Sequence, residues 1–193
     1  MEGKTTQFVK IQAARAAEIC AHFYVPTEAK EMLRDGMNPQ EFVVLLLEKE
    51  QYLAAIDFLA HALPVREGIW WGCLCMRHAL GDDLAPADRA AAMAAVAWVI
   101  EPSEEKRAAA VGPAEAAGMP SIAGWLARAA VRTGGNMAPP GVPFFKAPEP
   151  YAPAKGIATA VKFALAKAES SQLVKMQKAY VELGVQIAEG YLI

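Results

Sequence analysis

Two cysteines and a histidine lie close together in the middle of the chain, at Cys73, Cys75 and His78. Thiolates and imidazoles are preferred zinc ligands, and a cysteine beside a histidine can act as a nucleophile. On a helix, Cys73 and Cys75 point roughly 200° apart and cannot bind one ion, whereas Cys75 and His78 share a face. The spacing therefore favours two buried thiols that pack as small hydrophobic groups. No metal ligand, cofactor or catalytic residue is predicted here.

The same segment carries the tryptophan pair Trp70 and Trp71. Their side chains leave a helix about 100° apart, so both can lie on one wide buried face, or one can emerge. Most such pairs belong to a core, but an exposed tryptophan would be a typical binding residue for a protein partner. We therefore take Trp71 as a candidate partner-binding residue.

A segment rich in glycine and proline follows, at residues 134–153. Its six prolines exclude a helix or a central strand. It also contains Phe144, Phe145 and Tyr151, so it either straps these aromatic rings over the core or presents them to a partner. All three are candidate partner-binding residues. Gly134 and Gly135 lack the lysine and the helix start of a phosphate-binding loop, so nucleotide binding is unsupported.

Helical spacing of apolar residues dominates the rest of the chain, interrupted by proline, glycine and capping residues. It predicts helices at 9–25, 27–34, 39–49, 51–63, 64–80, 86–100, 103–117 with either a kink or a break at Pro113, 121–131, and 154–187 with a hinge at Ser170 and Ser171.

No segment alternates like a strand, so the fold class is all-α. We expect a compact multi-helix bundle or a short helix-hairpin array, with a proline-rich strap before the C-terminal helices. The chain, residues 1–193, reads as a single helical domain: a body at 8–133, the Gly/Pro-rich segment at 134–153 and C-terminal helices at 154–190.

The composition excludes several classes of protein. With 54% hydrophobic and 21% charged residues, the chain is too apolar for disorder, and its longest strongly apolar run, 42–47, is too short to span a membrane. A net charge of -2 lacks the excess of positive charge with which proteins bind nucleic acid. Three cysteines and no visible secretory signal favour a reducing compartment, so we expect a cytoplasmic protein.

Three stretches together resemble a known family: HALPVREGIWW at 61–71, GGNMAPP at 134–140 and VELGVQIAEG at 181–190. They are similar to an uncharacterised bacterial all-helical family that is often encoded near type VI secretion and forkhead-associated-domain genes. The resemblance covers most of the chain and carries over no catalytic residues. It implies an accessory or adaptor role.

Our leading hypothesis is a non-enzymatic cytoplasmic adaptor that binds another protein, with a type VI secretion component among the candidate partners. Two alternatives stay open. One is a metal-binding or thiol-dependent enzyme centred on Cys73, Cys75 and His78. The other is a regulatory or immunity-type domain that dimerises through its C-terminal helix, so a homo-oligomer is compatible with the sequence.

Overall fold

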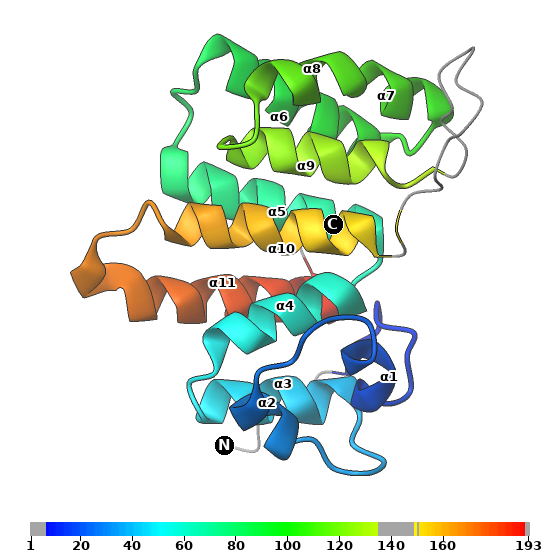
Figure 1. Ribbon diagram of the computed structural model, residues 1–193, viewed down its shortest axis with the longest axis vertical. Helices are drawn as coiled ribbons and strands as arrows, with labels where there is room; N and C mark the ends of the chain where they lie inside the picture. Colours follow the sequence, from blue (N-terminus) through cyan, green and yellow to red (C-terminus); the bar gives the residue numbers. More distant parts are fainter. Residues whose placement is uncertain (1–6, 135–148, 150, 192–193) are drawn as a thin grey trace.

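The structure of the protein is a computed structural model, which describes residues 7–134, 149 and 151–191. Within these residues every regular element is a helix, which confirms the all-α prediction (Figure 1). The helices are α1 (Ala16–Cys20), α2 (Thr27–Glu31), α3 (Pro39–Glu48), α4 (Tyr52–Ala62), α5 (Val65–Leu80), α6 (Pro86–Ile100), α7 (Glu104–Ala109), α8 (Val111–Ala117), α9 (Ile122–Val131), α10 (Ala152–Leu165), the 3₁₀ turn η1 (Ser170–Gln172) and α11 (Leu173–Ala188).

Several helices begin and end at the residues that their capping chemistry requires. Asn38 and Glu41 form a capping box at the start of α3, each side chain accepting the other residue's backbone N–H at 2.9 Å. Ser103 and Ser121 cap α7 and α9 in the same way, by accepting a backbone N–H three residues later. Gly81 ends α5 at φ 67, a conformation that glycine adopts without strain.

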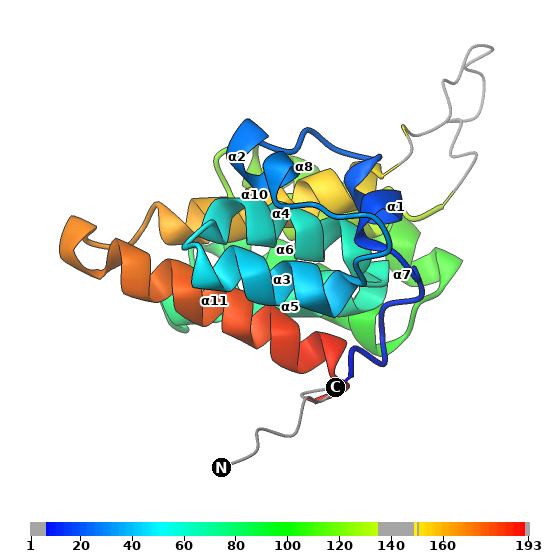
Figure 2. The same cartoon turned by 90° about the horizontal axis from the view of Figure 1, so that it is seen from below.

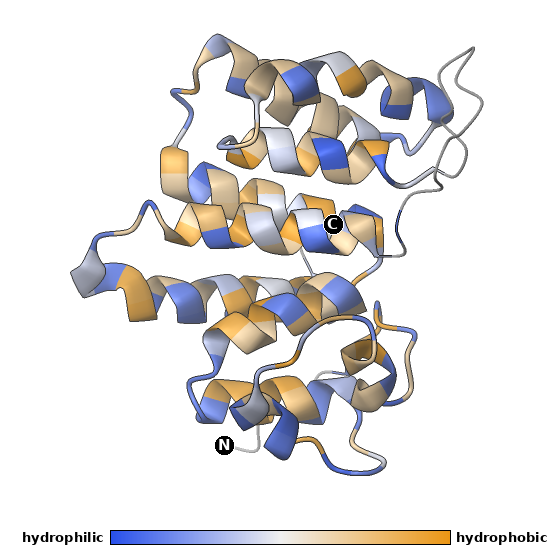
Figure 3. Cartoon of the chain, viewed as in Figure 1, coloured by the Kyte–Doolittle hydropathy of each residue, from blue (hydrophilic) through white to orange (hydrophobic). Residues whose placement is uncertain are grey.

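The central helix of the bundle is α5, which contacts α4, α6, α9, α10 and α11. Figure 1 shows α5 between α9 on one side and α10 on the other, with α7 and α8 at one end of the molecule and α1 to α3 at the other. In the same view every helix carries both hydrophobic and hydrophilic residues (Figure 3), as expected where each helix buries one face. The result is a helical bundle around one buried apolar core.

Two glycines allow the neighbours of α5 to come close. A Cβ atom on Gly72 would overlap the fully buried side chain of Leu126 in α9, and one on Gly68 would lie 2.8 Å from Cδ1 of Ile157 in α10. Close backbone approach of this kind needs a residue with no side chain. The packing of α9 and of α10 against α5 therefore requires glycine at these two positions.

The first predicted helix is wrong in its extent. Only Ala16–Cys20 is helical, and the residues before it run in an irregular path along the bundle. The Lys10 N–H donates to the Ala188 carbonyl at the end of α11, and Phe8 is buried. Contacts with distant helices thus override the local apolar spacing of this segment. Figure 2 shows α1 and α2 on the side of the bundle formed by α3 and α4.

Two other expectations concern helix breaks. The hinge predicted near Ser170 and Ser171 is confirmed, because η1 separates α10 from α11 there. The break near Pro113 falls instead at Ala110, and Pro113 is the third residue of α8. Proline fits this position because the first-turn N–H groups have no partner within the helix.

None of the described helices is long and apolar enough to cross a membrane. The Gly/Pro-rich segment lies mostly outside the described residues, so the predicted strap and the proposed division of the domain stay predictions.

The glycine packing gives a direct test. We expect Gly72→Ala to lower the free energy of unfolding by about 1–3 kcal/mol, because the added methyl must displace the fully buried side chain of Leu126. Gly156 lies in α10, where an added Cβ would make only ordinary contacts of 3.4 Å or more, so Gly156→Ala should leave it unchanged or raise it by up to about 1 kcal/mol. Urea denaturation of both variants measures the contrast, and equal effects from the two substitutions would contradict it.

Candidate functional site

The cysteines of α5 lie in the core. Cys73 and Cys75 are buried, and burial raises the pKa of Cys73 to about 12 and that of Cys75 well above its usual range. Both thiols are therefore uncharged at neutral pH and are poor nucleophiles and poor metal ligands. No three His, Cys, Asp or Glu side chains among the described residues come together as a metal site would require. This arrangement fits the interpretation of the thiols as core groups.

His78 belongs to a small hydrogen-bonded set that joins α5 to α11. The Tyr180 hydroxyl donates to the Cys75 carbonyl at 3.1 Å and lies 3.3 Å from Nδ1 of His78. The two rings meet edge to face, with their centroids 5.6 Å apart. Burial raises the pKa of Tyr180 above its ordinary value, so this hydroxyl stays protonated and acts as a donor. The set holds two helices together and presents no nucleophile.

Trp71, predicted as a candidate partner-binding residue, is fully buried. Its Nε1–H donates to the Tyr180 carbonyl of α11 at 2.9 Å. A side chain in this position supports the core and is not accessible to a partner. Phe144 and Phe145 lie outside the described residues. Of the four candidates, Tyr151 alone is described with an accessible side chain, which is 39% exposed.

Tyr151 belongs to a group of rings that we call the aromatic corner: His22, Phe23, Tyr24, His61 and Tyr151. The Tyr151 ring stacks on His22 with centroids 3.9 Å apart, and its hydroxyl lies 2.8 Å from His22 Nε2. Phe23 stacks on His61 at 4.6 Å. Tyr24 is 82% exposed beside them. The corner therefore joins the turn after α1, the end of α4 and the start of α10.

The backbone of Tyr151 is held in an uncommon conformation. Its φ is 64, in the left-handed region, where a residue with a side chain pays about 1–2 kcal/mol. Tyr151 is the N-cap residue of α10, and the next N–H, that of Ala152, donates to the Glu149 carbonyl at 2.9 Å. This turn directs the tyrosine ring onto His22. Strain of this kind is often found where a side chain is positioned for function.

His61 has an unusual electrostatic setting. Its Nδ1–H donates to the Asp57 carbonyl at 2.7 Å, so the other nitrogen, Nε2, carries the lone pair. Nε2 is buried and has no hydrogen-bond partner. Burial is the main cause that lowers the pKa of His61. The hydrogen bond to the Asp57 carbonyl and the charge of Asp57 oppose it, and Lys155 and His22 lower the pKa slightly further. His61 is therefore a neutral, unsatisfied acceptor at neutral pH.

Three surface hollows meet at the aromatic corner. One is bounded by His22, His61 and Tyr151, and a second shares His22 and His61 but extends toward α10. The third includes Phe23 and Tyr24 and reaches α2. Hollows that converge on partly exposed aromatic rings offer a surface for protein contacts.

The charges around these hollows are paired. Lys162 of α10 donates to both carboxylate oxygens of Asp57, at 2.6 and 2.7 Å, and Lys155 donates to Glu149 at 2.8 Å. Because both of these lysines have a carboxylate partner, the α10 side of the corner carries little net charge. Its chemistry is that of aromatic and hydrogen-bonding contacts, and it lacks the concentrated positive charge of a phosphate site.

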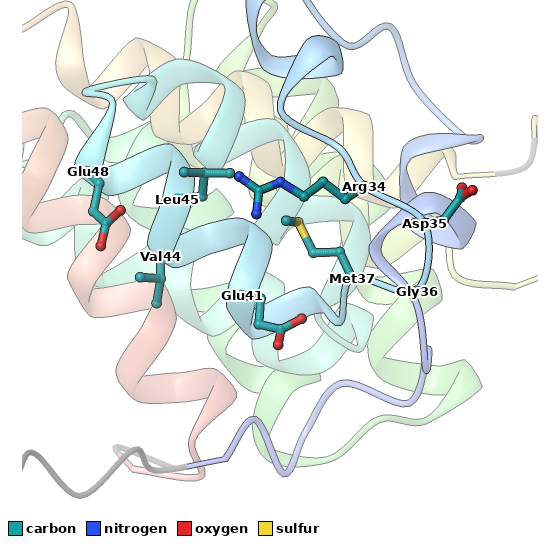
Figure 4. A pocket seen from close by; sticks show the side chains of 8 residues that line it. All are labelled: Arg34, Asp35, Gly36, Met37, Glu41, Val44, Leu45 and Glu48. Carbon is teal, nitrogen blue, oxygen red and sulfur yellow. The ribbon is translucent and has the colours of Figure 1, made fainter.

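A separate groove lies between the turn at 34–37 and α3 (Figure 4). Its lining combines apolar Met37, Val44 and Leu45 with charged residues. The figure shows the Arg34 side chain reaching over α3, while the Asp35 carboxylate points away. The lining carboxylate of Glu41 is already used to cap α3. The groove thus resembles a shallow contact surface more than a catalytic cleft.

Comparison with known families adds one finding. The model of DUF6931, a family of unknown function, matches residues 42–188. The chain belongs to this family. No curated protein and no solved structure was found to be similar to it. The DUF6931 match begins inside α3, so His61 and Tyr151 lie within it, whereas His22, Phe23 and Tyr24 lie before it.

Sequence reasoning identified Tyr151 and missed the rest of the corner. His22 and Tyr151 are 129 residues apart, and no periodicity relates them. A usable signal was the scarcity of histidine: two of the three histidines in the chain belong to the corner. Neither lies at a spacing that suggests a site on its own.

The setting of His61 predicts how stability depends on pH. Because the folded state lowers the pKa of His61 below its unfolded value near 6.5, the unfolded chain takes up this proton first as the pH falls. His61 should therefore have no effect on stability above about pH 7 and should reduce it progressively below about pH 6.5.

His61→Asn keeps a donor for the Asp57 carbonyl and removes the titration. We expect the drop in unfolding free energy between pH 7 and pH 5 to be smaller in this variant than in the wild type, measured by urea denaturation. An identical pH dependence in wild type and His61→Asn would show that His61 does not titrate as described.

Proposed function

We propose that this DUF6931 protein is a non-enzymatic helical adaptor that binds another protein at the aromatic corner. The observation that carries the proposal is the exposure of Tyr24 and Tyr151 beside three converging hollows. Tyrosine is enriched among the residues that dominate binding energy at protein interfaces, because it offers a large rigid surface and one polar group.

The chemistry of the corner favours a protein partner over a small charged substrate. Both lysines on its α10 side are paired with carboxylates, so they offer little charge to bind an anion. The buried thiols of α5 are poorly suited to nucleophilic catalysis. An apolar or aromatic segment of a partner fits this surface best.

The resemblance in sequence suggests where to look for the partner. It supports a bacterial origin and a role near a type VI secretion apparatus, so components of that apparatus are the first partners to test. We propose the cytoplasm as the compartment. The Gly/Pro-rich segment with Phe144 and Phe145 leads directly into Tyr151, and we propose it as a second contact region.

Affinity purification from native cells, followed by mass spectrometry, would identify the partner, and calorimetry with the purified pair would then measure binding. We expect Tyr24→Ala to weaken the affinity about tenfold or more, because truncating such a residue costs 1–2 kcal/mol or more. Tyr191→Ala is a matched control, since Tyr191 is an exposed tyrosine outside the corner. The double variant Phe144→Ala, Phe145→Ala tests the second contact region.

Because the lysines of α10 at the corner are paired with carboxylates, we expect the affinity to change little when the salt concentration rises from about 0.05 M to about 0.5 M. Binding through unpaired charges would weaken over the same range. Equal affinities for the wild type and the Tyr24→Ala variant would exclude the corner as the binding surface. A purification that recovers no specific partner would count against the adaptor role itself.

A further inference from the structure

Residues 7–14 lie across the bundle without forming a helix, and we call them the N-terminal segment. Figure 2 shows this segment, in dark blue, passing the end of α11 on its way to α1. Phe8 is 8% exposed and belongs to the apolar core, whereas its neighbour Val9 is 65% exposed. The segment is thus held by selected side chains, in the way that a domain binds an extended peptide.

Phe8 and Lys10 connect the N-terminal segment to three helices. Phe8 borders a hollow that also contains Pro39, at the start of α3. The Lys10 N–H donates to the Ala188 carbonyl at the end of α11, at 3.0 Å. The Lys10 ammonium lies 3.5 Å from the carboxylate of Glu67, in the first turn of α5. We call this receiving surface the segment site: Pro39, Glu67 and Ala188.

Glu67 gives the segment site a requirement for positive charge. Only 10% of its side chain is exposed, and Lys10 is its one ion-pair partner among the described residues. A carboxylate that has lost most of its water is unfavourable unless a cation or hydrogen-bond donors replace that water. A basic side chain at this point of an extended segment is therefore favoured over a neutral or acidic one.

The N-terminal segment is attached more weakly than the helices around it. In the part of the chain that the structure describes, a single backbone hydrogen bond joins it to the helices. Segments with few backbone bonds and much exposed surface open at a lower free energy than the core. The segment also precedes the part of the chain that matches DUF6931, whereas Glu67 and Ala188 lie within that part. Its departure would leave Glu67 without its cation.

We propose that the segment site is a docking site for an extended segment of a partner protein, and that the N-terminal segment occupies it as an internal ligand. The contacts define the chemistry of the partner. An aromatic side chain takes the place of Phe8, and two positions later a lysine or arginine pairs with Glu67. The backbone N–H of that basic residue donates to the Ala188 carbonyl. The internal ligand competes with every such partner, so only a segment that binds more tightly displaces it.

A peptide with the sequence of residues 7–14 tests the segment site in the full chain. In the double variant Phe8→Ala, Lys10→Ala the internal ligand is disabled, and we expect this variant to bind the labelled peptide with a dissociation constant on the order of 100 µM. The wild type should bind it about tenfold more weakly or less, because its tethered segment competes at an effective concentration of about 1 mM. Fluorescence anisotropy measures both affinities, and circular dichroism would verify that the variant folds. A folded variant that does not bind the peptide, or one that binds it no better than the wild type, overturns the proposal.

The role of Glu67 has its own test. A peptide with Lys10→Glu should bind the double variant at least tenfold more weakly than the original peptide, because two carboxylates would then meet. Adding Glu67→Gln to the double variant should bring the two affinities close together. A preference for lysine that survives Glu67→Gln would overturn the assignment of Glu67 as the receptor for the basic side chain.

The segment site and the aromatic corner are neighbours, since Lys10 also borders the hollow that contains His22, His61 and Tyr151. Tyr24→Ala, added to the double variant, separates the two surfaces. We expect it to leave the affinity for the peptide unchanged, because Tyr24 belongs to the aromatic corner. A tenfold loss of affinity would place the peptide at the corner and overturn the segment site.

Nuclear magnetic resonance of the wild-type chain tests displacement without any substitution. Unlabelled peptide is added to the isotope-labelled chain, up to about 5 mM, which exceeds the effective concentration of the tethered segment. The amide signals of Phe8 and Lys10 should move toward those of an unfolded segment, while the signals of the helical core stay in place. Unchanged Phe8 and Lys10 signals at this excess of peptide would show that the segment is a fixed part of the fold, and would overturn the proposal.

Discussion

The arrangement of the bundle depends on how closely other helices approach α5. Gly68 and Gly72 remove the side chains that would keep α10 and α9 away. On another side, Trp71 packs against Gly184 of α11 and donates its indole N–H to the Tyr180 carbonyl. Because interior packing is as dense as in organic crystals, each of these contacts limits how far a helix can shift. The ends of α4 and α10 that carry the aromatic corner are set by the same packing.

The family match covers only part of the surface on which the proposed function rests. The aromatic corner is composite, because its His61 and Tyr151 belong to that part, while His22, Phe23 and Tyr24 come from the segment before it. A partner that contacts Tyr24 therefore depends on residues that the family match does not include.

Local signals predicted most of the helices, and contacts distant in sequence explain the rest. The capping box at Asn38 and the glycine at Gly81 define helix ends within a few residues, so α3 and α5 were predicted nearly as observed. The segment before α1 has helical spacing but gains more from burying Phe8 and bonding Lys10 to Ala188, partners that spacing does not reveal. The sequence did not reveal the aromatic corner for the same reason, because His22 and Tyr151 come into contact only after the bundle has formed.

The stack of Phe23 on His61 couples the surface of the protein to protons in solution. The ring helps to exclude water from the imidazole, and that exclusion is the main cause of the low pKa of His61. Any ligand that moves Phe23 aside rehydrates His61 and lets its pKa return toward the ordinary value. Since linkage is reciprocal, proton uptake would in turn favour the state in which Phe23 is displaced. Through one aromatic contact, occupancy of the corner and acidity become parts of a single equilibrium.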